Sequence, residues 1–152
     1  MALKGIEIEV NGHGSVLRNV FSAVFSKISE DDCCYSSDYE IIVNNEGKRL
    51  PQPTRPKDLA ELLTGEGTVV TCGRFFCYPA GTSDMEISTF EEFENSPCET
   101  VILVIDGFFI ETYSKNENYL KDVMGFLQRQ NADAVTAEYV CGENVNRTSL
   151  EI

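Results

Sequence analysis

The stretch that most constrains the fold of this chain runs from Thr100 to Tyr113 and reads TVILVIDGFFIETY. Val101 to Ile105 is an unbroken apolar run, which is typical of a strand buried on both faces and is too short for a buried helix. The Asp106–Gly107 pair indicates a two-residue hairpin turn, because a type I′ turn needs positive φ at both central residues. The sequence therefore predicts an antiparallel hairpin over about 100–113 at the centre of a sheet, with Phe108 to Tyr113 as its returning strand.

Further strands are predicted on both sides of this hairpin. Residues 5–10 read GIEIEV, and this alternation is typical of a strand with one covered face. Runs rich in β-forming residues also occupy 39–43, 68–78 and 135–140. The polar, acidic segment 29–38 is predicted to be a loop. The tail over 142–152 is expected either to add an edge strand or to remain loose.

Helices are predicted between these strands. Apolar residues recur at helical spacing from Val16 to Ile28, with Ser15 as the N-cap. The other predicted helices begin at Pro56, at a capping box formed by Ser88 and Glu91, and at Asn116. This order of elements implies a single domain over residues 1–152 with an α/β or α+β fold, in which three to four helices cover a mixed β-sheet.

The charge of the chain bears on its partners. Its 152 residues carry a formal net charge of −13. Such a chain should be repelled by nucleic acids and anionic membranes, so neither is predicted as a partner, whereas a basic protein would be attracted. An acidic surface that is merely solvated is the alternative. No apolar run approaches the roughly 20 residues that span a bilayer, and MALKGIEIEV contains no apolar export segment, so the chain is expected to be cytoplasmic.

The densest acidic segment gives the candidate interaction surface. It consists of acidic residues around one aromatic side chain: Glu30, Asp31, Asp32, Tyr35 and Asp38. A solvated loop is the alternative interpretation. Glu7 and Glu9 share one face of the first predicted strand, and they are interpreted as solvated and not as a general acid and base.

A second candidate site is the loop before the first predicted helix, formed by Gly12, His13, Gly14 and Ser15. Free amides at a helix N-terminus attract anions, which suggests a phosphate or another small ligand. The dinucleotide pattern would need its third glycine where Leu17 stands, and a P-loop lysine is absent. A plain turn and cap is the alternative. His13 is the only imidazole of the chain, and no nucleophile is identified for it, so an enzyme is not predicted.

The six cysteines are expected to be free thiols, because no export signal accompanies them. Cys72 and Cys77 lie five residues apart in a predicted strand and point to opposite faces, so they cannot bridge each other. One histidine and no Cys-x-x-Cys pair leave too few ligands for zinc, and neither a metal nor a cofactor is predicted.

Two aromatic pairs fall within predicted strands. Phe75 is followed by Phe76, and Phe108 by Phe109. Successive strand residues point to opposite faces, so each pair is predicted to place one ring on each face of the sheet, packed in the core.

Several segments resemble one protein family. They are KGIEIEV with the glycine and serine at Gly14 and Ser15, then YPAGT, STFEEFENSPCE, VILVIDGFFIETYSKNENYL and ENVNRTSLEI. In these segments the chain is similar to the bacterial family called domain of unknown function 2691, whereas residues 29–64 carry no part of the resemblance. These are whole-segment similarities, so they imply a shared fold, and no site residues carry over.

Three hypotheses about function follow. The first is a non-enzymatic interaction protein, such as an inhibitor or immunity-type partner of a basic protein. The second is a ligand-binding domain or enzyme that uses the 11–15 loop, and it requires a pocket beside the first helix. The third is a structural subunit in which the tail pairs two copies edge to edge, and the oligomeric state is left open.

Overall fold

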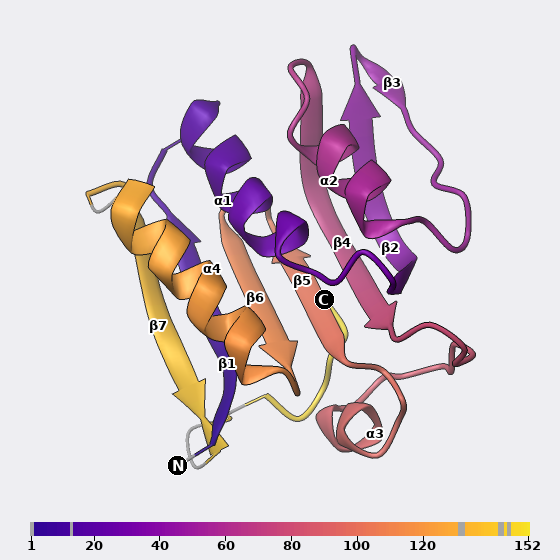
Figure 1. Cartoon of the computed structure of the whole chain (residues 1–152). Coiled ribbons are helices and arrows are strands. Elements are labelled where there is room, and N and C mark those ends of the chain that lie inside the picture. Colours follow the sequence, from indigo (N-terminus) through magenta and orange to yellow (C-terminus); the bar gives the residue numbers. More distant parts are fainter. Residues whose placement is uncertain (1, 13, 131–132, 143–144, 146) are drawn as a thin grey trace.

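The computed structural model describes residues 2–12, 14–130, 133–142, 145 and 147–152. Within these residues the fold is α+β, with one sheet of seven strands and four helices (Figure 1). The strands are β1 (Leu3–Val10), β2 (Cys33–Val43), β3 (Glu46–Gly47), β4 (Thr68–Tyr78), β5 (Thr100–Ile105), β6 (Phe109–Ser114) and β7 (Val135–Cys141). The helices are α1 (Ser15–Ser26), α2 (Pro56–Leu63), α3 (Phe90–Glu94) and α4 (Glu117–Gln130). No helix formed by the described residues is long and apolar enough to cross a bilayer.

The sheet has the strand order β3-β2-β4-β5-β6-β1-β7. All pairings between these strands are antiparallel, so the predicted mixed sheet is wrong. Helices α1 and α2 connect strands that are not neighbours in the sheet. The first strand, β1, lies instead between β6 and β7.

The hairpin of β5 and β6 confirms the main prediction, with β5 fourth among the seven strands. Asp106 and Gly107 have the positive φ that was expected, at 52° and 70°. The loop is one residue longer than predicted, because Ile105 pairs with Phe109 and Phe108 belongs to the loop. Three-residue loops are the next commonest hairpin connection after two-residue loops.

Helices α1, α2 and α4 cover one face of the sheet, with α1 between the other two (Figure 1). The apolar side of α1 is buried, and the ring of Phe25 meets that of Phe75 edge-on at a centroid distance of 5.1 Å. Further core residues on this face include Leu59 and Leu63 of α2, and Leu120, Val123 and Leu127 of α4. The predicted helical stripes are therefore confirmed as the main core.

The opposite face carries a second, smaller core. Helix α3 and the C-terminal tail cover it, and they bury Tyr78, Phe93, Leu103, Tyr113 and Leu150 among others. In the part of the tail that the structure describes (142, 145 and 147–152), the chain neither joins the sheet nor stays loose, since Leu150 N donates to Ser88 O at 2.8 Å and Thr89 forms a bridge with Ser149. Burial of Leu150, which is 0% exposed, explains this path.

Arg74 of β4 fixes the tail to the sheet. Its side chain is 9% exposed, and its guanidinium lies 5.0 Å from the centroid of the Phe76 ring. It donates to Leu150 O at 2.8 Å and to Ile87 O at 2.7 Å, and it pairs with the Asp38 carboxylate at 3.1 Å. The buried charge is therefore paired and hydrogen-bonded, as a buried guanidinium requires.

Two local predictions are corrected. Residues 33–38 form the first half of β2 and not a loop, because Cys33, Cys34 and Tyr35 pair in register with the last residues of β4. Such pairing satisfies the backbone and overrides a polar sequence. The capping box of α3 uses Thr89 and Glu92 in place of Ser88 and Glu91, since both pairs fit the same spacing.

Candidate functional site

The predicted interaction residues do not form one continuous surface. Glu30 and Asp31 are exposed in the loop between α1 and β2, but Asp32 is 7% exposed. Tyr35 packs edge-on against Tyr78 with ring centroids 5.6 Å apart, and Asp38 is paired with Arg74. Only Glu30 and Asp31 therefore remain free acidic side chains, and their role in binding stays a prediction.

Asp32 has an unusual environment for a carboxyl group. Burial is the main cause that raises its pKa to about 6, and the charges of Glu99 and Asp31 add to the effect. The group is therefore partly protonated near neutral pH, which reduces the acidity of the predicted surface further.

The predicted ligand loop is described at Gly12, Gly14 and Ser15, whereas His13 lies outside the described residues. Ser15 is already the first residue of α1, so its prediction as the N-cap is wrong. Gly14 takes the cap position with a φ of 63°, and no side chain caps the helix. Ligand binding by this loop stays a prediction.

A cavity of about 500 Å³ lies beside the first half of α1. Most of its lining side chains are apolar, and they come from α1, α2, β4 and the hairpin loop: Leu17, Phe21, Leu63, Val69, Val70 and Phe108. Val69 is 56% exposed and Phe108 is 52% exposed. The pocket that the second hypothesis requires is thus present. The predicted burial of Phe108 and Phe109 is wrong, whereas that of Phe75 and Phe76 is confirmed.

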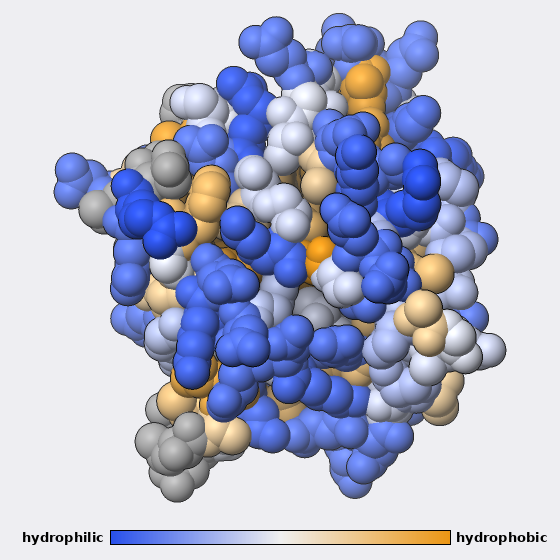
Figure 2. Space-filling model, in the orientation of Figure 1, coloured by the Kyte–Doolittle hydropathy of each residue, from blue (hydrophilic) through white to orange (hydrophobic). Residues whose placement is uncertain are grey.

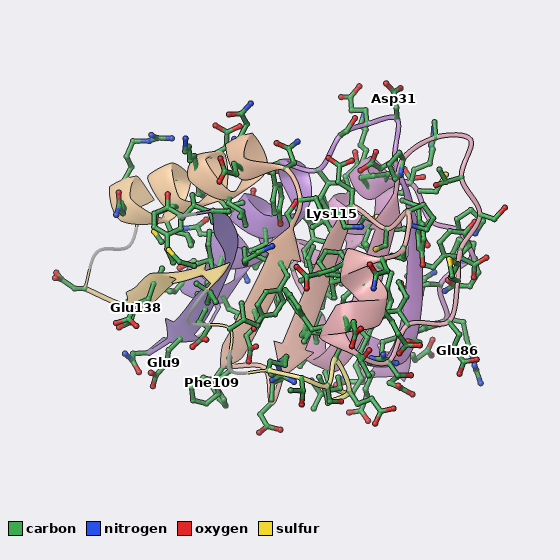
Figure 3. All side chains as sticks on the ribbon, turned by 90° about the horizontal axis from the view of Figure 1, so that it is seen from below. Glu9, Asp31, Glu86, Phe109, Lys115 and Glu138 are labelled. Atoms are coloured by element: carbon green, nitrogen blue, oxygen red, sulfur yellow. The ribbon has the colours of Figure 1, made fainter. Side chains whose placement is uncertain are left out.

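The half of the second face formed by β6, β1 and β7 carries a row of carboxylates. Glu7 of β1 lies directly between Glu111 of β6 and Glu138 of β7 in the strand register. In the next row Glu9 lies between Phe109 and Thr136. These residues line a shallow hollow of about 210 Å³. Figure 3 shows Glu9, Phe109 and Glu138 on the side of the sheet away from α1, α2 and α4, whereas Asp31 projects on the side of these three helices.

Among the residues that the structure describes, only one carboxylate of this group, that of Glu111, has a cationic neighbour. Arg147 of the tail donates to both oxygens of Glu111, at 2.8 and 2.9 Å. Burial would raise the pKa of Glu111, but the bonds from Arg147 and the Tyr113 hydroxyl outweigh it and hold this pKa below its ordinary value. Glu7, Glu9 and Glu138 are exposed and form no salt bridge with any described residue. We call Glu7, Glu9, Glu111, Glu138 and Phe109 together the acidic sheet face.

A family model described as "Protein of unknown function (DUF2691)" matches residues 3–151. The chain belongs to this family. The match confirms the resemblance found in the sequence segments. The chain is also similar to "Uncharacterized protein YncE" of Bacillus subtilis (strain 168), with 31% identity over 75 residues, which are 49% of this chain and 48% of that protein. The aligned region thus spans about half the length of this curated relative, and no solved structure matches the chain.

In this DUF2691 member the thiols of Cys34, Cys77 and Cys98 are buried. Cys34 and Cys77 face each other across β2 and β4 with their Sγ atoms 3.0 Å apart. The contact with Cys34 and burial raise the pKa of Cys77 well above its ordinary value, and burial raises that of Cys98 to about 12. All six cysteines are free thiols, and among the described residues no cluster could hold a metal ion. The buried thiols Cys34, Cys77 and Cys98 therefore act as small core residues, whereas Cys33, Cys72 and Cys141 are half-buried.

Sequence reasoning reached only part of the acidic sheet face. Glu7 and Glu9 were interpreted as solvated, and Glu111 and Glu138 were not singled out. The alternation in β6 and β7 places these two glutamates on an outer face, which is the signal that could have found them. Their alignment depends on β1 lying between β6 and β7, and no local pattern shows this.

Proposed function

We propose that this protein is a non-enzymatic, cytoplasmic binding protein whose acidic sheet face docks a basic protein. The observation that carries the proposal is the aligned row Glu138–Glu7–Glu111, in which only Glu111 has a cationic neighbour among the described residues. An uncovered face is ordinary for an antiparallel sheet. It is unusual, however, that three carboxylates lie directly opposite one another in one row with no Lys or Arg between them.

The energetics favour a role for this row in binding. Like charges directly opposite on neighbouring strands are destabilising, and cross-strand pairs contribute roughly 0.2–1 kcal/mol each. A local conflict of this kind is typical of functional surfaces. Lys or Arg side chains of a partner would neutralise Glu7, Glu9 and Glu138, and their association would be accelerated by the net charge of −13.

The apolar part of the surface supports a protein as the partner. Phe109 is 46% exposed and lines the hollow together with Glu9. Aromatic residues surrounded by polar groups are enriched at protein interfaces, where they supply buried area. A basic protein with an apolar contact for Phe109 fits this face better than a free cation does.

A capture experiment tests the proposal. The purified protein is used as bait in native cell extract at low salt, and bound proteins are eluted with high salt and identified. A basic protein released by salt is expected. The triple variant Glu7→Gln, Glu9→Gln, Glu138→Gln should no longer retain this basic protein, because three negative charges of the acidic sheet face are removed. Circular dichroism checks that the variant keeps the fold.

The matched control is Glu30→Gln, Asp31→Asn, Glu61→Gln, which changes the net charge by the same amount at exposed positions away from the acidic sheet face. It should retain the captured protein. Loss of binding in the control alone would favour the loop around Glu30 and Asp31 instead. Failure of the bait to retain any basic protein would contradict the proposal as a whole.

A further inference from the structure

We infer that the cavity beside α1 binds a small amphipathic molecule with an apolar body and one carboxylate group. The cavity and the acidic sheet face share no lining residue, so this inference is independent of the proposed docking function. On the helix-covered face, pale to orange residues lie among hydrophilic ones in the region between α1 and α2 (Figure 2).

The cavity lies where β4 extends beyond its pairing with β5. β4 pairs with β2 as far as the Thr68–Val43 pair, but its pairing with β5 stops at Gly73 and Val104. Residues 68–72 therefore have a strand neighbour on one side only. Leu17 and Phe21 of α1, Leu63 of α2 and the loop with Phe108 enclose the space that is left.

The lining fits an apolar body. The cavity volume of about 500 Å³ is within the usual range of small-molecule sites, which is roughly 300–1,000 Å³. Val69 and Phe108 remain more than half exposed on its walls, although large apolar side chains gain free energy when covered. An apolar ligand between them would provide that cover.

Arg18 supplies the charged end of the site. Its half-buried side chain lines the cavity, and it forms no ion pair within 4.0 Å with the described residues. Arg55, Arg74 and Arg147 each pair with a carboxylate, whereas Arg18 has no such pair with a described residue and is the arginine that lines this apolar cavity. Guanidinium groups bind carboxylates through two parallel hydrogen bonds.

Other ligand classes fit less well. A phosphate carries up to about two negative charges, and one arginine offsets only one of them. Asp106 also lines the cavity and repels any anion, which disfavours a ligand with more than one negative charge. The hairpin loop lies against the edge of β4 at Val70, since a Cβ added at Gly107 would be only 3.2 Å from Val70 O, and this contact disfavours the addition of a peptide strand there. The hairpin loop thus already occupies that edge, and the ligand must be compact.

The experiment uses decanoate as the probe and decanol as its uncharged counterpart, with binding followed by amide chemical shifts in NMR. Decanoate should shift the amides of Leu17, Arg18, Val69 and Val70, and it should bind more tightly than decanol. Arg18→Gln should weaken decanoate binding by about tenfold or more and leave decanol binding unchanged, because a charge-assisted hydrogen bond is lost. Arg49→Gln is the control with the same change of net charge at an exposed position outside the cavity.

The carboxylate assignment and the existence of the site can each fail separately in this experiment. Equal binding of decanoate and decanol, or an Arg18→Gln variant that binds decanoate normally, would overturn the carboxylate assignment. Absence of shifts around the cavity with both probes would overturn the site itself. Shifts at these residues that follow protein concentration, with dimers in sedimentation, would assign the cavity to a second copy. None of these results alters salt-sensitive capture by the acidic sheet face, so failure of the two proposals can be distinguished.

Discussion

The two faces of the sheet are covered in different ways. Three helices cover one face, whereas α3 and the tail cover only part of the other and leave the acidic sheet face open. The sequences of the strands follow this difference, since β5 is apolar on both sides and β1 alternates apolar residues with glutamate. Charged side chains therefore lie where neither a helix nor the tail covers the sheet, and the same sheet has both a buried core and an acidic surface.

The largest expected effect contrasts an aromatic residue on each face. Phe25→Ala on the helix-covered face should lower the free energy of unfolding by about 3–5 kcal/mol, because a fully buried ring is removed. Phe109→Ala on the open face should lower it by less than about 1 kcal/mol. Urea unfolding of both variants measures the difference. Similar losses would show that the open face is covered in solution.

A smaller effect tests how firmly the tail belongs to the second core. Leu150→Ala should lower the free energy of unfolding by about 2–4 kcal/mol, since Leu150 is 0% exposed. Ile152→Ala is the control, because Ile152 is 45% exposed and should change stability little. Hydrogen exchange of α3 in both variants shows whether the tail is needed there. A tail that contributes nothing would leave α3 equally protected in Leu150→Ala.

The smallest effect concerns Asp32, in the segment that leads from α1 into β2. The native state raises its pKa to about 6, above the ordinary value of 3.8, so the native state binds more protons than the unfolded state between these values. Its contribution to stability therefore falls as the pH rises through this range. Asp32→Asn should raise the free energy of unfolding by about 1 kcal/mol at pH 7 and leave it nearly unchanged at pH 4.

Urea unfolding at both pH values measures this gain, with Glu61→Gln as an exposed control. An Asp32→Asn variant that is less stable than the wild type at pH 7 would show that the ionised carboxylate is needed for the fold.

The sequence predicted the parts of the fold that depend on local patterns. The positive φ angles at Asp106 and Gly107, the Pro56 helix start and the alternation in β1 follow from local chemistry, and they are confirmed. The direction of strand pairing and the path of the tail depend on contacts between distant residues, and these predictions were wrong. Ser88 and Thr89 are neighbours that both fit the capping-box spacing, so the box was predicted one residue before its observed position.

The candidate sites, like the fold, were predictable only where a local sequence pattern marks them. The 11–15 loop lies next to a cavity, but the residues that line the cavity include Arg18, Val69 and Phe108, which no motif connects. The acidic sheet face combines glutamates from three strands that are far apart in the chain. Its prediction would have required the strand order, which periodicity within one strand does not contain.

The position of β1 between β6 and β7 has a consequence for the rate of folding. Glu7 pairs with Glu111 and Glu138, and every contact that β1 makes in the sheet closes a loop of about 100 residues or more. Contacts of such long range slow folding, because the entropy of closing the loop is lost before the contacts form. Until β1 docks, β6 and β7 each present a free edge to other chains, and such edges promote intermolecular pairing. Refolding yield should therefore fall as protein concentration rises, even though the native sheet covers both of these edges.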